Sequence, residues 1–172
     1  TNDRRQRQMC IRDSILIGAG PSVYPSADGS LVRKMIYSRF WRFVFTITGA
    51  PAFIAGANQL GYLNYAPSAE EVNDYAASYS GRIGQVTKWF KGYPNGCKDI
   101  DPHLNNIDIP VHILWGDQDA FLKADNAERL HARLPNSSLT IFKDCGHFFY
   151  QDKCSDFIKL LQSWINGGYK SD

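Results

Sequence analysis

The chain has 172 residues, of which 44% are hydrophobic and 21% are charged, and its formal net charge is +2. These values predict a single globular domain with a sizeable core and do not indicate a polyanion partner. Four cysteines without paired spacing do not form a disulfide scaffold, so we interpret them as reduced thiols in a cytoplasmic protein. No run of about 18 apolar residues occurs, and we expect no membrane partner.

Residues 1–14 form a basic stretch with four arginines. The stretch resembles translated sequencing-adapter DNA, and we interpret it as non-native. A basic arm for nucleic acid is the alternative. Because the stretch is short, has no interleaved aromatic residues and precedes a neutral body, we expect no nucleic-acid partner.

Residues 15–20 are a short β-branched apolar run that ends at Gly20-Pro21, which predicts a strand buried on both faces. Residues 31–89 then follow a helical spacing. We expect breaks at 49–51, where Gly and Pro occur, and at 92–96. Ser68 and Glu71 predict a capping box at the start of a helix.

After Pro110 the spacing changes to short strands that alternate with helices. The expected elements are a strand at 111–115, a helix at 124–134, a strand at 138–142 and a helix at 153–165. This alternation predicts a parallel sheet with right-handed crossovers. The loops 116–119 and 144–147 each follow a strand directly, so they are expected at the same edge of the sheet, where ligands bind in such folds.

Asp119 and His147 are the candidate catalytic residues in these two loops. A carboxylate four residues after a strand can turn back over the sheet edge, although Asp119 also fits a helix N-cap or a turn, and Asp117 competes for the same role. His147 follows Gly146, which permits a tight turn, and a neutral imidazole can act as a general base. A histidine bonded to backbone at the edge of the core is the alternative.

The two motifs together, Trp115-Gly-Asp-Gln-Asp119 and Asp144-Cys-Gly-His147, resemble the C-terminal signature of α/β-hydrolases. The resemblance implies an α/β fold in which this chain holds the C-terminal part, parallel strands six to eight with flanking helices. It assigns 15–30 and 101–172 to the partial core and 31–100 to a helical cap. In that family the order along the chain is nucleophile, acid, histidine, so Asp119 would orient His147 as the base.

The family's nucleophile elbow is absent, because no G-x-S-x-G, nor the same motif with Asp or Cys, occurs in the sequence. We therefore expect that the chain is truncated at its N-terminus and that the nucleophile lies upstream. Some relatives place the acid after the sixth strand, where Asp28 is the candidate, and we rank Asp119 above it.

The sequence motif of residues 144–147, together with Asp152-Lys153, closely resembles that of epoxide hydrolases and haloalkane dehalogenases. Lys88-Trp89-Phe90 is similar to a cap segment in which epoxide hydrolases have a Tyr after the Trp. Phe90 cannot donate the hydrogen bond of that Tyr, and Tyr93 is displaced, which weakens an epoxide-opening assignment.

We expect a cofactor-independent hydrolase of a small apolar ester. The alternatives are an aspartate-nucleophile epoxide hydrolase or dehalogenase, and a non-catalytic ligand-binding protein of the same fold. The histidines and cysteines show no zinc spacing and no phosphate-binding glycine loop occurs, so we expect no metal and no cofactor. Cys145 as a thiol nucleophile is a minor alternative. The sequence does not indicate an oligomeric state.

Overall fold

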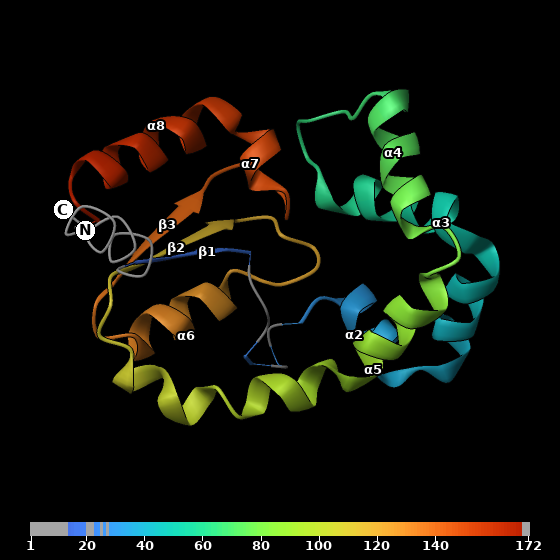
Figure 1. The fold of residues 1–172 in the computed structure, drawn as a ribbon, viewed down its shortest axis with the longest axis horizontal. Coiled ribbons are helices and arrows are strands. Elements are labelled where there is room, and N and C mark those ends of the chain that lie inside the picture. The colour runs from blue at the N-terminus through green and yellow to red at the C-terminus, as the bar shows by residue number, and fades with distance from the viewer. Residues whose placement is uncertain (1–13, 20–22, 25, 27, 170–172) are drawn as a thin grey trace, which may run out of the picture.

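The computed structural model describes residues 14–19, 23, 24, 26 and 28–169, with the side chains of 94–98 excepted. Three strands form one sheet on one side of the molecule, and four helices gather on the other side (Figure 1). The strands, in sheet order, are β1 (Ile15–Gly18), β2 (Val111–Gly116) and β3 (Ser137–Phe142). The stretch 1–14 that we interpret as non-native lies, except for its last residue, outside the described residues.

All neighbouring strands are parallel. Val111 at the start of β2 aligns with Ile15 of β1 and with Ser137 of β3. The carboxyl ends of the three strands therefore meet at one edge, and the predicted parallel sheet is confirmed. The two loops that carry Asp119 and His147 leave the sheet at this edge.

β2 is the centre of the core, because every one of its residues is buried. Ile113 and Trp115 point into the apolar cluster on one face of the sheet, and Leu114 points into the cluster on the other face. In Figure 1, α6 (Asp125–Arg133) lies below the sheet, and α7 (Phe149–Asp152) and α8 (Cys154–Asn166) lie above it.

β1 is less buried than the sequence predicts. Leu16 is 40% exposed, and the four residues alternate between half-buried and exposed. The prediction of burial on both faces is wrong because β1 is an edge strand: among the described residues only β2 pairs with it, and its outer edge is uncovered.

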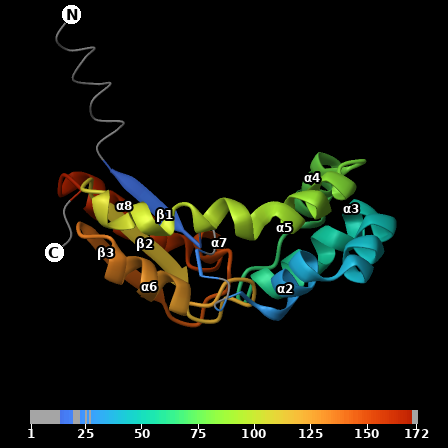
Figure 2. The same cartoon turned by 90° about the horizontal axis from the view of Figure 1, so that it is seen from below.

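A block of helices, residues 30–98, is inserted between β1 and β2 and lies beside the sheet (Figure 2). Within this helical block α3 packs against α4 and α5, and α2 packs against α5. A 3-10 helix, η2, then leads into β2. The bounds are α2 (Ser30–Tyr37), α3 (Arg39–Gly61), α4 (Ala69–Tyr79), α5 (Ile83–Lys98) and η2 (Asp101–Asn106).

Local sequence signals set several helix ends in this block. The predicted break is confirmed at Gly49, whose φ of 77° lies in the left-handed region that favours glycine, so α3 consists of two helical segments. The predicted capping box is confirmed: Ser68 accepts from Glu71 N, and the Glu71 side chain accepts from Ser68 N. The predicted stop at 92–96 is wrong, because α5 continues to Lys98.

By length and composition alone, α3 is the one helix among the described residues that could cross a membrane. Its most apolar window has a mean hydropathy of 1.2, and only 11% of that window is buried inside the molecule. Packing in the core of the protein therefore does not account for the apolar composition of α3.

Candidate active site

The structure brings the two sequence-predicted site residues together at the carboxyl edge of the sheet. His147 Nδ1 lies 2.7 Å from Asp119 Oδ2, a hydrogen-bond distance. The Asp119 side chain is fully buried, whereas that of His147 is 20% exposed. Because a carboxylate oxygen accepts, Nδ1 donates, and this leaves Nε2 as the acceptor nitrogen of the neutral ring.

The Asp119 carboxylate is fixed by its own loop. Its second oxygen, Oδ1, accepts from Phe121 N at 2.8 Å and from Leu122 N at 2.9 Å. The turn after β2 thus provides two backbone donors that hold one oxygen in place, so that the other is presented to the imidazole. The acid has the orienting geometry of a catalytic triad.

The two competing carboxylates occupy other positions near the acid loop. Asp117 Oδ1 accepts from Cys145 N at 3.3 Å, and its Oδ2 lies 3.8 Å from Lys143 Nζ, so Asp117 links the two loops away from the imidazole. Asp28 is buried at 3% exposure and pairs through its backbone with Leu122, next to the acid loop. The hydrogen bond to His147 belongs to Asp119.

Two glycines allow the loops after β2 and β3 to come into contact. A Cβ added to Gly116 would lie 2.1 Å from Gly146 O, and one added to Gly146 would lie 2.3 Å from Gly61 O. Gln118 N donates to Cys145 O at 3.0 Å across the same contact. A side chain at Gly116 would separate the loops that carry the acid and the base, and one at Gly146 would push the histidine loop away from the end of α3.

Asp152 ties the histidine loop to the helical block. Its carboxylate accepts from Gly146 N at 2.9 Å and from the backbone amides just after α3, those of Leu63, Asn64 and Tyr65, at 2.8–3.2 Å. Burial raises the pKa of Asp152, but these backbone hydrogen bonds outweigh it, and the net pKa lies below the ordinary value. In addition, Phe148 N donates to Gly61 O at 3.1 Å.

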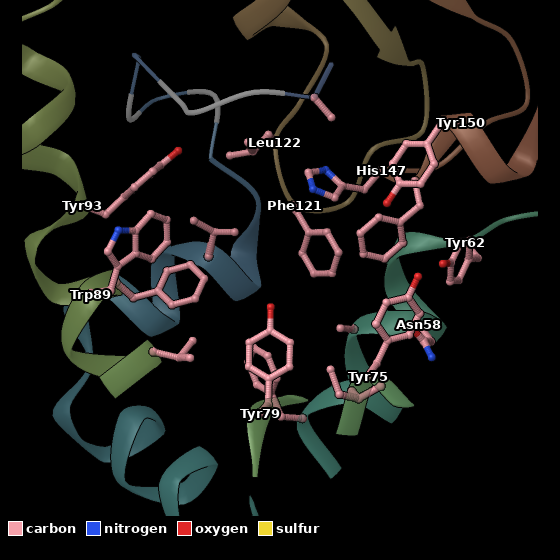
Figure 3. A pocket seen from close by; sticks show the side chains of 18 of the residues that line it. Asn58, Tyr62, Tyr75, Tyr79, Trp89, Tyr93, Phe121, Leu122, His147 and Tyr150 are labelled. Carbon is pink, nitrogen blue, oxygen red and sulfur yellow. The ribbon is translucent and has the colours of Figure 1, made fainter. Parts of the chain in front are cut away.

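His147 opens onto a cavity of about 1040 Å³ between the sheet edge and the helical block (Figure 3). Phe121 and Phe148 pack edge-on against the imidazole, with ring centroids 5.0 and 5.1 Å from it. The rest of the wall is mostly aromatic or aliphatic, and its polar groups are mainly tyrosine hydroxyls and amides. The polar side chains that line it are Asn58, Tyr62, Tyr75, Tyr79, Gln85, Trp89, Tyr93 and Tyr150.

The helical block contributes the residues that distinguish the possible chemistries. Phe90 lines the cavity and packs edge-on against Trp89, and Tyr93 lines it one turn later. The wall therefore has an apolar ring where epoxide hydrolases are expected to have a hydroxyl, with the Tyr93 hydroxyl displaced along the helix.

The remaining candidates lie outside this constellation. Burial raises the pKa of the Cys145 thiol to about 12, so it is not available as a thiolate nucleophile. His112 contacts Thr140 Oγ1 at 3.0 Å, and His131 contacts Ser137 Oγ at 2.9 Å. Among the residues whose positions are described, no group of three or more His, Cys, Asp or Glu side chains could hold a metal ion.

The sequence did not indicate the role of Asp152 or of Gly61. Asp152 belongs to the motif that resembles the hydrolases, but its partners are backbone amides 87–89 residues away, and no spacing rule reports such contacts. Gly61 ends a helix and would be interpreted from sequence as a stop signal alone.

Comparison with known proteins agrees with this geometry. The curated relatives include the 2-hydroxy-6-oxononadienedioate/2-hydroxy-6-oxononatrienedioate hydrolase of Klebsiella pneumoniae, which is 32% identical over 83 residues, 48% of this chain and 29% of that protein. A second hydrolase of the same name from Pseudomonas putida is 35% identical over 72 residues, 42% of this chain and 25% of that protein.

Solved structures show the same fold. The 2-hydroxy-6-oxo-6-phenylhexa-2,4-dienoate hydrolase of Rhodococcus sp. strain RHA1 superposes with a TM-score of 0.70 at 13% identity, over 90% of this chain and 55% of that one. A serine hydrolase from Cycloclasticus zankles gives 0.68 at 18% identity, over 92% and 57%.

The chain thus spans a little over half the length of these solved hydrolases, and its matches cover less than a third of the curated ones. The family model described as α/β-hydrolase fold matches residues 21–153, most of the chain, including both Asp119 and His147. The chain belongs to the α/β-hydrolase fold family.

Proposed function

We propose that the chain provides the acid and the base of a hydrolase that cleaves an ester of a small, uncharged and mostly apolar substrate. The observation that carries the proposal is the Asp119–His147 hydrogen bond at the wall of the cavity. The helical block acts in this proposal as the cap over the site, and the nucleophile is carried by residues outside these 172.

In the proposed reaction a serine hydroxyl attacks the ester carbonyl and His147 Nε2 takes its proton. The imidazolium then returns the proton to the leaving alcohol, and the acyl-enzyme is hydrolysed by water that the same nitrogen activates. Asp119 holds the ring in the tautomer that keeps Nε2 free and stabilises the imidazolium. Metal ions and cofactors have no part in these steps.

The cavity wall supports an uncharged substrate. None of the described residues that line it is Asp, Glu, Lys or Arg. Burying a carboxylate of the substrate against such a wall, without a cationic partner, would cost several kcal/mol. Aromatic and aliphatic acyl groups gain instead from the transfer out of water.

The proposal is tested in the full-length hydrolase of the source gene, with p-nitrophenyl esters of short aliphatic and aromatic acids. We expect His147→Ala and Asp119→Asn to lower kcat/KM by roughly 10³–10⁴-fold. His131→Ala, at an exposed histidine of α6, is the matched control and should retain activity. Equal activity of the three variants would exclude the assigned roles.

The isolated 172-residue chain should not turn over these esters, because it has no nucleophile elbow. Hydrolysis by this chain that disappears in His147→Ala would show that the nucleophile lies within it.

A second candidate is hydrolysis of a carbon–carbon bond in an oxo-dienoate, which the names of the relatives favour. A phenyl-bearing substrate would suit the aromatic wall better than a dioate. Turnover of 2-hydroxy-6-oxo-6-phenylhexa-2,4-dienoate with higher kcat/KM than any ester would select this candidate.

An aspartate nucleophile would change the reaction to epoxide opening or dehalogenation, in which His147 activates water against an ester intermediate. The motif at 144–147 favours this version, and Phe90 disfavours it. Turnover of an aryl epoxide or a haloalkane, with none of the esters, would select it. Ligand binding without turnover in the full-length protein would indicate a binding protein of the same fold.

A further inference from the structure

The first segment of α3 carries an exposed apolar stripe. Phe40, Phe43 and Ile47 are 61–65% exposed, although large apolar side chains are usually buried. Their spacing of three and four residues places them on one face of the helix. Tyr37, at the end of α2, is 64% exposed next to them. We call these four residues the α3 stripe.

The sequence around the α3 stripe is basic. No acidic residue occurs between Asp28 and Glu70, whereas Arg33, Lys34 and Arg39 lie in this interval and are exposed. Large apolar side chains flanked by cations are the composition of a helix that lies in the interface of a membrane. The cations would meet anionic head groups while the rings enter the acyl boundary.

Side-chain contacts hold the end of α2 against the start of α3. Arg42 Nη1 donates to Met35 O at 3.0 Å and to Ile36 O at 2.6 Å, and Lys34 Nζ lies 4.9 Å from the Trp41 ring centroid. Arg42 thus fixes the end of α2 against α3 rather than extending into solvent.

The geometry fits a helix that lies on a bilayer better than one that spans it. The break at Gly49 limits the first segment to residues 39–48, about 15 Å of helix, whereas a hydrocarbon core is about 30 Å thick. Beyond the break, α3 contributes Phe53, Ile54, Ala57 and Asn58 to the cavity wall. One helix therefore joins the stripe to the cavity.

A second copy of the chain fits this surface less well than a lipid surface does. In a two-fold interface the same patch meets itself, so the cations around the stripe would face the same cations. α3 also lies at the opposite end of the molecule from the sheet (Figure 1), so a strand that paired with the outer edge of β1 would not cover it.

We propose that the α3 stripe and its basic flank dock the protein on an anionic lipid surface. Because α3 also contributes to the cavity wall, docking brings the cavity near a phase in which apolar substrates concentrate. This inference differs from the expectation of no membrane partner, which rested on the absence of a long apolar run, since an interfacial helix does not need one.

The test is co-sedimentation of the full chain with phosphatidylcholine vesicles that do or do not contain phosphatidylglycerol. We expect binding to the anionic vesicles that decreases with added salt. Phe40→Ser/Phe43→Ser should lower the partition coefficient by about tenfold or more. Arg33→Gln/Arg39→Gln should lower it by about fivefold for each charge removed.

Matched controls are available outside the stripe. Ile158→Ser/Ile165→Ser changes two apolar residues of α8 that are 46% and 47% exposed, and Arg4→Gln/Arg5→Gln removes two cations near the N-terminus. Both should bind as the wild type does. No binding to anionic vesicles, or loss of binding only in these control variants, would overturn the proposal. So would a dimer at working concentration that Phe40→Ser/Phe43→Ser dissolves, because the stripe would then belong to a second copy.

Discussion

The Asp119 carboxylate is positioned by three hydrogen bonds. One carboxylate oxygen is held by two amides of its own loop, and the other receives His147 Nδ1. The pair is carried by the loops after β2 and β3, which lie side by side because the strands are parallel neighbours. The geometry of the acid and the base does not depend on the nucleophile being present.

His112 is a buried histidine with a structural role on β2. Its Nε2 contacts Thr140 Oγ1 at 3.0 Å, and its ring packs edge-on against Trp164 with centroids 5.5 Å apart. Burial lowers the pKa of His112 below the ordinary value of 6.5. The ring is therefore kept neutral in the folded protein at a pH where the unfolded chain takes up a proton.

Unfolding is thus coupled to proton uptake by His112. The free energy of unfolding therefore decreases as the pH falls below about 6.5. We expect the urea midpoint of the wild type to decrease between about pH 7.5 and pH 5.5, and His112→Leu to decrease less over the same range. His131→Leu, at an exposed histidine, should follow the wild type. Identical pH dependence in all three proteins would refute the assignment.

At the scale of elements, the end of α3 and the histidine loop form one joint. Phe148 N donates to Gly61 O, and the Asp152 carboxylate binds backbone amides on both sides of the joint. A Cβ on Gly61 would lie 2.3 Å from the ring of Phe148, which itself packs against His147. The end of α3 is therefore in contact with the imidazole through the ring of Phe148.

Gly61→Ala should destabilise the protein by about 1–3 kcal/mol, because the Phe148 ring must leave its place. Gly56→Ala is the matched control in the same helix, since an added Cβ there meets no atom within 4 Å. It should stabilise by up to about 1 kcal/mol through helix propensity. Urea unfolding of both variants measures the difference, and equal midpoints would show that the joint can relax.

The sequence predicted the elements that depend on local signals. β2, β3, α6 and the capping box at Ser68 follow from periodicity and capping residues. The pairing of Asp119 with His147 could also be anticipated, because parallel strands place their following loops together. The catalytic roles of the two residues remain predictions.

The sequence did not predict features that depend on distant contacts. The short helix α7 was missed, since four residues carry too little periodicity. The continuation of α5 through Gly92 and Pro94 was missed as well, because the turn-forming residues there outweighed the helical spacing. The hydrogen bonds of Asp152 join segments that are far apart along the chain, and local sequence patterns do not predict them.

At the scale of the whole molecule, the described sheet has an unpaired edge at β1. Within the described residues no strand pairs with the outer edge of β1, and Leu16 on this strand is 40% exposed. Unpaired backbone groups beside an apolar side chain form a template for pairing with another chain. The exposure of β1, which the sequence misjudged, therefore has a consequence for solution behaviour.

We expect the 172-residue chain to self-associate through this edge as its concentration rises. Leu16→Lys places a charge on the exposed face of β1, where lysine opposes edge-to-edge pairing, and should lower the aggregated fraction. Ile158→Lys introduces the same charge at a residue of similar exposure, 46%, on α8, so it separates the effect of the edge from that of net charge. Light scattering over a concentration series measures the difference between the two variants. A wild-type chain that stays monodisperse and melts cooperatively would contradict the expectation, and equal improvement by both variants would assign the effect to charge alone.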